Sequence, residues 1–582
     1  MKISLLCVLA IGAALLAAMS AGAADGPQPY EPAGATSTPK VEARWDFYRD
    51  CAQAEDLLRK LNAAYPGLSR LESIGKSYGG REMWVLTITN FDSGDPARKP
   101  GFWIDGGIHA NELQGPDVVL YTCWYLLEMY GKSDFVRELV DRHIFYCLPV
   151  LNPDGRDFHF YQPNDVNSPR SGLRPVDEDR DGLFDEDGPD DLNGDGSISM
   201  MRKQDPHGRF KPDEKYPMLM RRCEPGEQGE YMLLGEEGTD NDGDGVVNED
   251  GPGGGDPNRD YPWRWQPRYI EGGAFRYPLS FIENRSAADF VMAHPNIAGG
   301  QSFHNMAGMV LRGPGDPEDQ FPYEDIAVYD VIGKKGAEIL PGYTYGSISQ
   351  DLYTAYGTSV DWLYNMQGAL SFTNELNTSF NYFSQQDNGG WFGSREEQAK
   401  FNELLLFGNA SVPWQPYDHP QYGAVEIGGY KKTWGRQPAS FMLEEECHRN
   451  MAFVLYHASQ LPQLEVESYE TKDLGGGLTE LTATIVNRKL IPSRLMVDVL
   501  RGLTRPDEVS LEGGGLNVVM GSFSEDQFFQ HAQVQKREGR VVRIPRVGSL
   551  GAVYVRWLLK GPLPEAITAG SVKGGTHTLK LK

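Results

Sequence analysis

The fold is decided by the stretch Phe102-Trp103-Ile104-Asp105-Gly106-Gly107-Ile108-His109-Ala110-Asn111-Glu112, in which a predicted strand runs into a loop with two potential metal ligands. The paired glycines allow the chain to turn tightly after the strand. His109 and Glu112 are three residues apart, so both can reach one ion from a single turn. A lone His-x-x-Glu pair is more often exposed on a helix, but His304 ends another strand-like run, 297–303. Three such ligands with an open fourth position are what a catalytic zinc needs, so the pattern predicts a zinc site.

Strand-like and helix-like runs alternate on both sides of this stretch, from residue 45 to 173 and again from 270 to 461. This alternation predicts an α/β sheet with helices on its faces. After Leu461 the pattern changes to short alternating runs broken by Gly and Pro. That change predicts a C-terminal β-sandwich domain over residues 462–582, after a first domain over residues 45–461.

Length and charge narrow the class of the protein further. With 582 residues the chain is too long for one hydrophobic core, which agrees with two domains. Its formal net charge of −26 disfavours nucleic acid or an anionic membrane surface as a partner.

The N-terminus has the layout of a secretory signal peptide. Lys2 is followed by an apolar run from Ile3 to Met19 and by the small residues Ala21-Gly22-Ala23. We therefore expect a signal peptide over residues 1–23 and a secreted or periplasmic protein that leaves the membrane once the signal is removed. An uncleaved membrane anchor is the alternative. Five scattered cysteines remain after residue 23, an odd number whose pairing the sequence does not determine.

An Asp-rich insertion over residues 177–251 repeats itself. The pattern Asp-x-Asp-x-Asp-Gly occurs at 177–182 and 240–245, and a shorter copy begins at residue 191. Oxygen ligands at positions 1, 3 and 5 before a glycine can wrap a hard cation, although in the two longer copies Gly188 and Gly251 replace the Glu expected at position 12. The repeats predict structural calcium sites, with a solvated acidic linker as the alternative. The candidate ligands are Asp177, Asp179, Asp181, Asp185, Asp187, Asp191, Asn193, Asp195, Asp240, Asp242, Asp244, Asn248 and Asp250.

Four further motifs follow in a fixed order. They are 148–155, which ends a strand, 256–260, which closes the acidic zone, 302–304, and the stretch from Gly346 to Glu375. Together with His109 and Glu112, this set resembles the zinc metallocarboxypeptidase family typified by carboxypeptidase A. The resemblance covers roughly residues 45–455, apart from the acidic insertion, and leaves the C-terminal domain unexplained. It implies a mixed sheet with helices on both faces and an exopeptidase that shortens peptides or proteins from the C-terminus.

The resemblance also implies a role for individual residues. It makes His109, Glu112 and His304 the ligands of one catalytic zinc and Glu375 the general base that takes a proton from the attacking water. Arg202 matches the arginine that polarises the scissile carbonyl. The group that grips the terminal carboxylate is matched by Asn258, Arg259 and Tyr353.

The pocket under the terminal side chain is uncharged in this resemblance. Val360 stands where members that release basic residues place an Asp, although Asp351 lies close in sequence. We therefore expect hydrophobic or aromatic terminal residues to be preferred. The matching pocket positions are Ile348, Leu352, Ala355, Val360 and Thr373.

Two other functions fit the same sequence less well. One is a zinc amidohydrolase of this fold that acts on cell-wall peptides or acylated amino acids. The other is a non-catalytic calcium-dependent binding protein. Asn111 and the pair Asn305-Met306 depart from the carboxypeptidase A pattern, which leaves the preference for residues upstream of the cut open.

Overall fold

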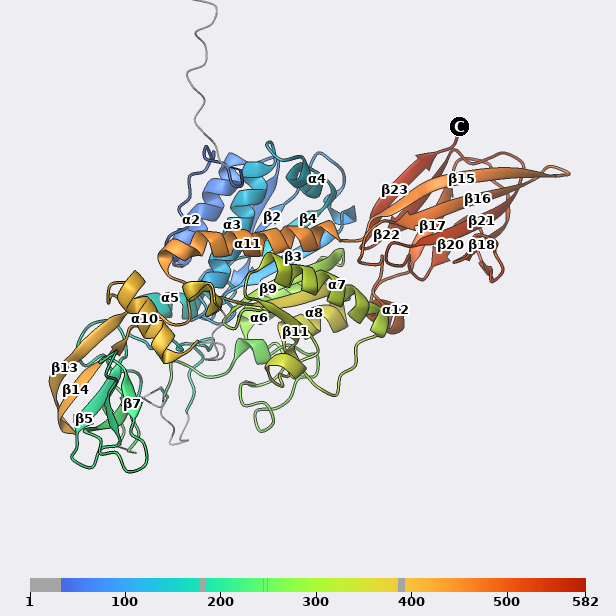
Figure 1. The fold of residues 1–582 in the computed structure, drawn as a ribbon. Coiled ribbons are helices and arrows are strands. Elements are labelled where there is room, and N and C mark those ends of the chain that lie inside the picture. Colours follow the sequence, from blue (N-terminus) through green and yellow to red (C-terminus); the bar gives the residue numbers. More distant parts are fainter. Residues whose placement is uncertain are drawn as a thin grey trace, which may run out of the picture. The chain divides into compact units, whose positions relative to one another are not determined.

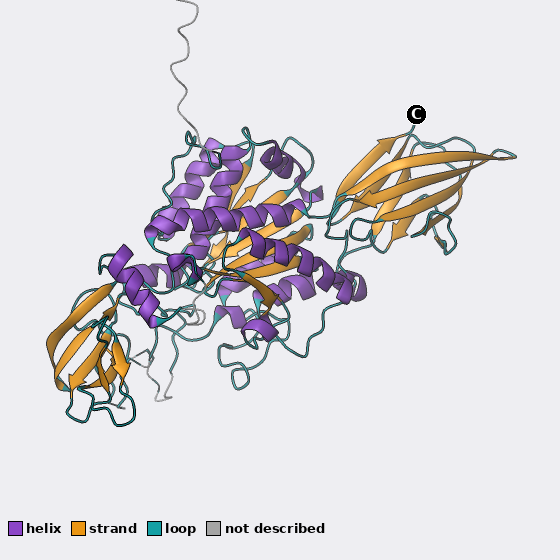
Figure 2. Cartoon of the chain, in the orientation of Figure 1, coloured by secondary structure: helices purple, strands orange, loops and turns teal. Residues whose placement is uncertain are grey.

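The computed structural model describes residues 33–177, 182, 184–185, 187–243, 245–248, 250–385 and 393–582. The expected signal peptide therefore lies outside the described residues. All helices and strands of the described residues lie between Ala43 and Lys582, one of the two units into which the chain divides. They form an α/β part followed by an all-β part (Figure 1, Figure 2). Within the described residues, no helix is both long enough and apolar enough to cross a membrane.

The α/β part is built on an eight-stranded mixed sheet with the strand order β1-β2-β4-β3-β9-β12-β10-β11. The four middle strands, β4, β3, β9 and β12, run parallel, so their carboxyl ends meet at one edge. These strands are buried nearly throughout, as expected of a parallel sheet covered on both faces. The bounds are β1 Ser69–Lys76, β2 Glu82–Ile88, β3 Gly101–Gly106, β4 Ile144–Leu148, β9 Ile297–Asn305, β10 Met309–Arg312, β11 Thr344–Ser347 and β12 Leu370–Leu376.

Helices cover both faces of this sheet, because successive side chains of a strand point in opposite directions. Phe102 of β3 packs against His457 of α11, whereas its neighbour Trp103 packs against Phe290 of α6. One face carries α2 Cys51–Ala64, α3 Gln114–Met129, α4 Asp134–Arg142 and α11 Ser440–Ser459, and the other carries α6 Ile282–Ala293 and α8 Ser359–Gln367. The remaining helices of this part are α5 Pro153–Tyr161, α7 Tyr323–Ile339, α9 Phe380–Phe383, α10 Arg395–Leu405, the short 3₁₀ turns η1 Pro96–Arg98 and η2 Pro257–Arg259, and the π turn η3 Ile348–Leu352.

The acidic insertion contributes four strands to a second sheet that the sequence did not predict. This six-stranded antiparallel sheet has the order β13-β14-β5-β8-β6-β7. Its small core contains Met201, Val425 and Ile427, so segments more than 200 residues apart pack together. The bounds are β5 Met200–Gln204, β6 Phe210–Pro212, β7 Met220–Arg222, β8 Tyr231–Glu236, β13 Ser411–His419 and β14 Gly423–Tyr430.

The C-terminal part is all-β, as the sequence predicted, apart from the short helix α12 Met496–Arg501. Antiparallel sheets of five strands (β15-β16-β21-β18-β19) and four strands (β20-β17-β22-β23) share one apolar core around Trp557. The bounds are β15 Leu464–Gly475, β16 Leu478–Asn487, β17 Asp507–Glu512, β18 Val518–Ser524, β19 Gln533–Val534, β20 Val541–Ile544, β21 Ala552–Lys560, β22 Ala566–Ser571 and β23 Gly575–Lys580.

Candidate zinc centre and substrate site

The three predicted zinc ligands lie where parallel strands end. His109 and Glu112 occupy the loop between β3 and α3, and His304 is the second-last residue of β9, the strand beside β3. The turn after β3 depends on glycine, since a Cβ on Gly106 would come within 2.7 Å of the backbone of Gly115. The close approach of strand and helix therefore fixes the loop that carries two of the ligands.

The side chains of these residues converge on one point. The Nδ1 atom of His109 lies 3.0 Å from Oε1 of Glu112, and Nδ1 of His304 lies 3.0 Å from Oε2 of the same carboxylate. The two Nδ1 atoms are 3.2 Å apart, and one ligand atom from each residue lies within 4.8 Å of the others. All three residues are at most 2% exposed. Two imidazoles and one carboxylate in this arrangement are a donor set that suits zinc.

The outer nitrogen of His109 is held by a carboxylate to which the sequence analysis gave no role. Oδ1 of Asp256 lies 2.9 Å from Nε2 of His109, which turns Nδ1 toward the other ligands. Burial raises the pKa of Asp256, but Arg170 and His109 outweigh that effect and hold it well below its usual range. Asp256 is the first residue of the 256–260 motif, and its place in that motif was the available signal.

Glu375, the predicted general base, is brought beside the centre by strand register. It lies in β12 directly opposite His304 of the parallel strand β9, so both side chains point to the same face of the sheet. The residue is half-buried. Burial raises the pKa of the Glu375 carboxyl, and the nearby Glu112 acts in the same direction.

An arginine that the sequence analysis did not select reaches the centre. Nε of Arg170 donates to Oδ2 of Asp256 at 2.9 Å, and its Nη1 donates to Oε1 of Glu112 at 3.2 Å. Its side chain keeps 36% of its surface exposed, so Arg170 lies between the buried ligands and solvent. Arg170 lies in a loop without regular structure, which explains why no periodic pattern marked it.

Arg202, the arginine predicted to polarise the carbonyl, is not brought to this centre. It lies in β5 of the six-stranded sheet, where its guanidinium forms an ion pair with Glu426. The guanidinium packs between the rings of Tyr231 and Trp414, at 4.2 and 4.3 Å from their centroids. Its charge is therefore neutralised within that sheet, whereas the guanidinium of Arg170 contacts Glu112 of the candidate centre.

The three residues predicted to grip a carboxylate lie together. Nη2 of Arg259 donates to the Tyr353 hydroxyl at 3.3 Å and lies 3.9 Å from Oδ2 of Asp256. Oδ1 of Asn258 accepts the N–H of Ser359 at 2.9 Å, which ties η2 to the start of α8. Tyr353 is 39% exposed, whereas the Arg259 side chain is 9% exposed. Asp256 thus links the arginine of this group to the ligand His109.

Four of the five predicted pocket residues form one apolar cluster. The cluster also includes Met309 and Leu311 of β10, which the sequence analysis did not select, and the fifth residue, Thr373, faces Leu311 in the strand register. Asp351 stays outside, because its carboxylate accepts the N–H of Ser347 at 2.7 Å. The predicted members of the cluster are Ile348, Leu352, Ala355 and Val360.

A buried carboxylate, that of Asp361, directly follows Val360 of this cluster in sequence. Oδ2 of Asp361 accepts the N–H of Gly315 at 2.9 Å, and Oδ1 has no hydrogen-bond partner within the described part of the chain. Burial raises the pKa of Asp361 to about 7. The residue is 3% exposed.

Two groups of the predicted calcium ligands lie together. Asp187, Asp240 and Asp242 bring carboxylate oxygens within 4.8 Å of one another. The N–H of Asp250 donates to the main-chain carbonyl of Asp187, and the N–H of Asp187 donates to the Asp250 carboxylate. The N–H of Asn248 donates to the Asp187 carboxylate. The other group is the short loop of Asp191, Asn193 and Asp195. Calcium at either place stays a prediction.

The remaining predicted ligands are engaged locally or lie outside the described residues. Asp177 accepts the N–H of Gly182, and Asp185 accepts the N–H of Val176. Asp179, Asp181 and Asp244 lie outside the described residues.

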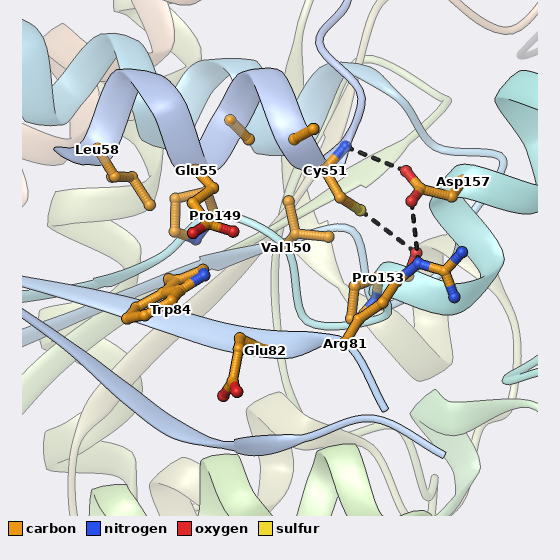
Figure 3. A pocket seen from close by; sticks show the side chains of 12 residues that line it. Cys51, Glu55, Leu58, Arg81, Glu82, Trp84, Pro149, Val150, Pro153 and Asp157 are labelled. Atoms are coloured by element: carbon orange, nitrogen blue, oxygen red, sulfur yellow. Dashed lines mark hydrogen bonds and ion pairs between the residues drawn. The ribbon is translucent and has the colours of Figure 1, made fainter. Parts of the chain in front are cut away.

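A separate cavity of about 250 Å³ lies between α2, β2 and the start of α5, and none of the three zinc ligands lines it (Figure 3). Cys51 donates its thiol to the carbonyl of Pro153 at 3.3 Å, and Arg81 donates to Asp157 at 2.9 Å. Burial raises the pKa of Cys51, so its thiol stays protonated at neutral pH and is a poor nucleophile. We therefore place no chemistry in this cavity.

Comparison with known proteins agrees with this geometry. A family model described as zinc carboxypeptidase matches residues 54–388, and a domain of unknown function matches residues 463–582. The chain is 39% identical over 101 residues to Carboxypeptidase D of Drosophila melanogaster, which covers 17% of this chain and 7% of that protein. It is 30% identical over 124 residues to a protein of Ajellomyces capsulatus named Inactive metallocarboxypeptidase ECM14, which covers 21% of each chain.

A solved structure gives a weaker likeness. The crystal structure of the carboxypeptidase A from Helicoverpa armigera matches 78% of this chain and 80% of its own with a TM-score of 0.43 and 17% identity. The matched segments span less than two thirds of the two relatives named above. Because the first family model covers more than half of the sequence, the chain belongs to the zinc carboxypeptidase family.

Proposed function

We propose that this protein is a secreted, zinc-dependent carboxypeptidase that removes single residues from the C-terminus of peptides and prefers hydrophobic or aromatic ones. The observation that carries the proposal is the network around Asp256. This carboxylate contacts the ligand His109, the accessible Arg170 and the carboxylate-gripping Arg259. A metal site and two guanidinium groups are therefore held in one place, which suits a substrate that ends in a carboxylate.

The donor set fits zinc. His109 and His304 present Nδ1 atoms, Glu112 presents both carboxylate oxygens, and Asp256 orients the first imidazole. When bound, zinc lowers the pKa of a water molecule to about 7 and polarises a carbonyl group. We propose His109, Glu112 and His304 as its ligands.

The side chains around the ligands transfer the proton and bind the substrate. Glu375 takes the proton of the attacking water on its carboxylate and returns it to the leaving amine, a task that suits a carboxyl whose pKa burial has raised. Arg170 donates hydrogen bonds to the scissile carbonyl oxygen as negative charge develops there. Arg259 receives the terminal carboxylate with help from Asn258 and the Tyr353 hydroxyl.

The apolar cluster around Val360 supports the preference for the released residue. A Lys or Arg placed there would lose its hydration without gaining a counter-charge, while Phe or Leu gains about 1.5 to 3 kcal/mol from burial. Secretion rests on the predicted signal peptide, and bound calcium rests on the acidic repeats. Both belong to the proposal.

The test is to incubate the purified protein with a peptide library and with the same peptides amidated at the C-terminus. We expect stepwise loss of terminal Phe, Tyr, Leu and Met from the free acids only, and no cleavage after zinc is removed with a chelator. Cleavage of amidated peptides or of internal bonds would assign the site to an endopeptidase or a deacylase. Because one relative is named inactive, absence of any cleavage is a real outcome and would overturn the proposal.

A further inference from the structure

Glu237, which directly follows β8, carries a buried oxygen atom without a partner. The residue is 0% exposed. Its Oε1 accepts the N–H of Ser199 at 2.7 Å and the hydroxyl of Ser199 at 2.8 Å. Its Oε2 has no hydrogen-bond partner in the part of the chain that the structure describes. A buried carboxylate oxygen is costly unless a donor or a cation satisfies it, so this atom points to a ligand.

The acidic loop that leads to Ser199 faces this carboxylate. Ser199, whose N–H and hydroxyl Glu237 accepts, follows Gly196 of the loop by only three residues, which brings the loop beside the Glu237 side chain. In agreement with this, burial raises the pKa of Glu237 and the carboxylates of Asp195 and Asp191 act in the same direction. Burial lowers the pKa of Lys432 and Asp191 acts against that effect, but the Lys432 ammonium donates its hydrogen bonds to the main-chain oxygens of His159 and Gln162. Three carboxylates thus gather where no side-chain cation pairs with them among the described residues.

The loop is already shaped around its own carboxylates. Asp191 accepts the N–H groups of Gly194 at 2.8 Å and Gly196 at 2.7 Å through its two oxygens. Asn193 accepts the N–H of Asp195 at 2.9 Å. Side-chain oxygens at positions 1, 3 and 5 of a glycine-ended loop are the early ligands of an EF-hand type site. Position 12, where such a loop supplies a bidentate Glu, is Arg202 in this chain.

We infer that Glu237 supplies the missing late carboxylate of a Ca²⁺ site whose other ligands are Asp191, Asn193 and Asp195. The carboxylate comes from the residue after β8 and not from the loop itself. The N–H of Glu237 also donates to the carbonyl of Ser199 and so fixes the register of the two segments. This inference deepens the calcium part of the proposed function and does not depend on peptidase activity.

Calcium at this site would stabilise the arm of residues 164–170, which carries Arg170. Ser197, directly after the loop, forms a β-bridge with Asn164, and the N–H of Ile198 donates to the carbonyl of Asn164. Further along this arm, the carbonyl of Asn167 accepts a hydrogen bond from Asn111, between the zinc ligands. Calcium in the loop therefore holds the arm near its start, six residues before Arg170.

The decisive variant is Glu237→Gln, with Glu214→Gln as a matched control at an exposed position of the same insertion. Ca²⁺ binding is measured by calorimetry on the zinc-loaded protein, without any peptide. We expect Glu237→Gln to lose one bound calcium per chain or to bind it at least about tenfold more weakly, whereas Glu214→Gln binds as the wild type does. The peptidase-deficient Glu375→Gln variant should also bind calcium normally, so failure of the proposed activity and failure of this site are distinguishable.

The melting temperature gives a second measurement, in which the difference between Glu237→Gln and the wild type should change sign when calcium is added. In calcium-free, zinc-supplemented buffer, Glu237→Gln should melt at or above the wild type because an unpaired buried charge is gone. With calcium added, it should melt below the wild type. Asp195→Asn should lose the same bound ion, which keeps the test valid if Glu237→Gln folds poorly. A wild type that binds no calcium, or variants at both positions that bind it unchanged, would overturn the inference.

Discussion

The central sheet and the acidic insertion both gather carboxylates, but they hold them in different ways. In the central sheet, Glu375 lies near the end of β12 and Glu112 lies in the loop that follows β3, and each is beside a histidine. In the insertion, Asp191 is held by N–H groups of its own loop, only three to five residues away. A site at strand ends is thus fixed by the whole core, whereas a loop site is fixed locally and depends on its ion. Changes in the sheet should therefore affect chemistry, and changes in the insertion should affect stability.

The largest effect is expected for Glu375→Gln in the central sheet. Loss of the proton acceptor should reduce hydrolysis by about 10³-fold while zinc content stays near one per chain, because Glu375 is not a proposed ligand. His304→Ala should lose both activity and zinc. Activity assays beside metal analysis decide this, and a Glu375→Gln protein that retained more than a few per cent of activity would refute the assigned role.

The second prediction compares alanine substitutions of Arg170 and Arg202. Arg170→Ala should lower kcat/KM by about 10²-fold or more, since a donor to the developing oxyanion is lost. Arg202→Ala should leave kcat/KM within about threefold, but it should lower the melting temperature because Glu426 loses its partner inside a packed sheet. Steady-state kinetics and thermal melts of both variants are needed. The reverse pattern would restore Arg202 to the site.

Specificity for the released residue should show a smaller effect. Matched peptides that end in Phe should be cleaved at least about tenfold faster than those that end in Arg, a ratio that requires only about 1.4 kcal/mol. Val360→Asp should narrow or reverse the ratio by placing a counter-charge in the apolar cluster. Equal kcat/KM values for the two peptides in the wild type would mean that an acid, such as Asp351, reaches the pocket.

The smallest effect concerns the pH dependence of stability. The pKa of Asp361 is about 7 in the folded chain, above its unfolded value of about 3.8. The protonated Asp361 carboxyl therefore contributes its full share of stability below pH 4, and this share is lost as the pH rises toward 7. Asp361→Asn should therefore raise the melting temperature at pH 8 by about a few degrees and change it little at pH 4. No gain at pH 8 would show that Asp361 stays charged and paired.

Glu227 of the insertion provides a control for which the dependence of stability on pH has the opposite sign. Hydrogen bonds from Arg221 and Lys211 lower the pKa of Glu227, so its contribution is present at neutral pH and is lost on acidification. Glu227→Gln should slightly lower the melting temperature at pH 8, and the difference should disappear as the pH falls. Thermal melts across this pH range would compare the two carboxylates directly.

The sequence predicted the features that local patterns encode. The strand before His109, the strand that ends at His304 and the all-β C-terminal part all left apolar runs of the right length and spacing. The candidate pocket residues could be selected because the stretch from Gly346 to Glu375 resembles the family without a gap. Strand register then brings Glu375 beside His304 without any further assumption.

What the sequence missed depends on contacts between distant segments. Arg170 lies in an irregular loop, and only its contacts with Asp256 and Glu112 mark it as part of the site. Arg202 was chosen because its neighbours in sequence matched, but the pairing of β5 with β14 directs it elsewhere. Asp256 and Glu237 likewise acquire their importance from partners that are between 38 and 147 residues away. Such partners leave no periodic signal in the chain.

The six-stranded sheet also has a consequence for biosynthesis. β5 to β8 are translated well before β13 and β14, yet β14 is the direct neighbour of β5. Roughly two hundred further residues must be synthesised before β14 can pair with β5. Until then one edge of β5 has unpaired hydrogen-bonding groups, and such an edge is prone to pair with other chains. The insertion therefore cannot be transplanted as a self-contained cassette, and a ribosome-bound chain that ends before β13 should be more susceptible to proteases there than the finished protein.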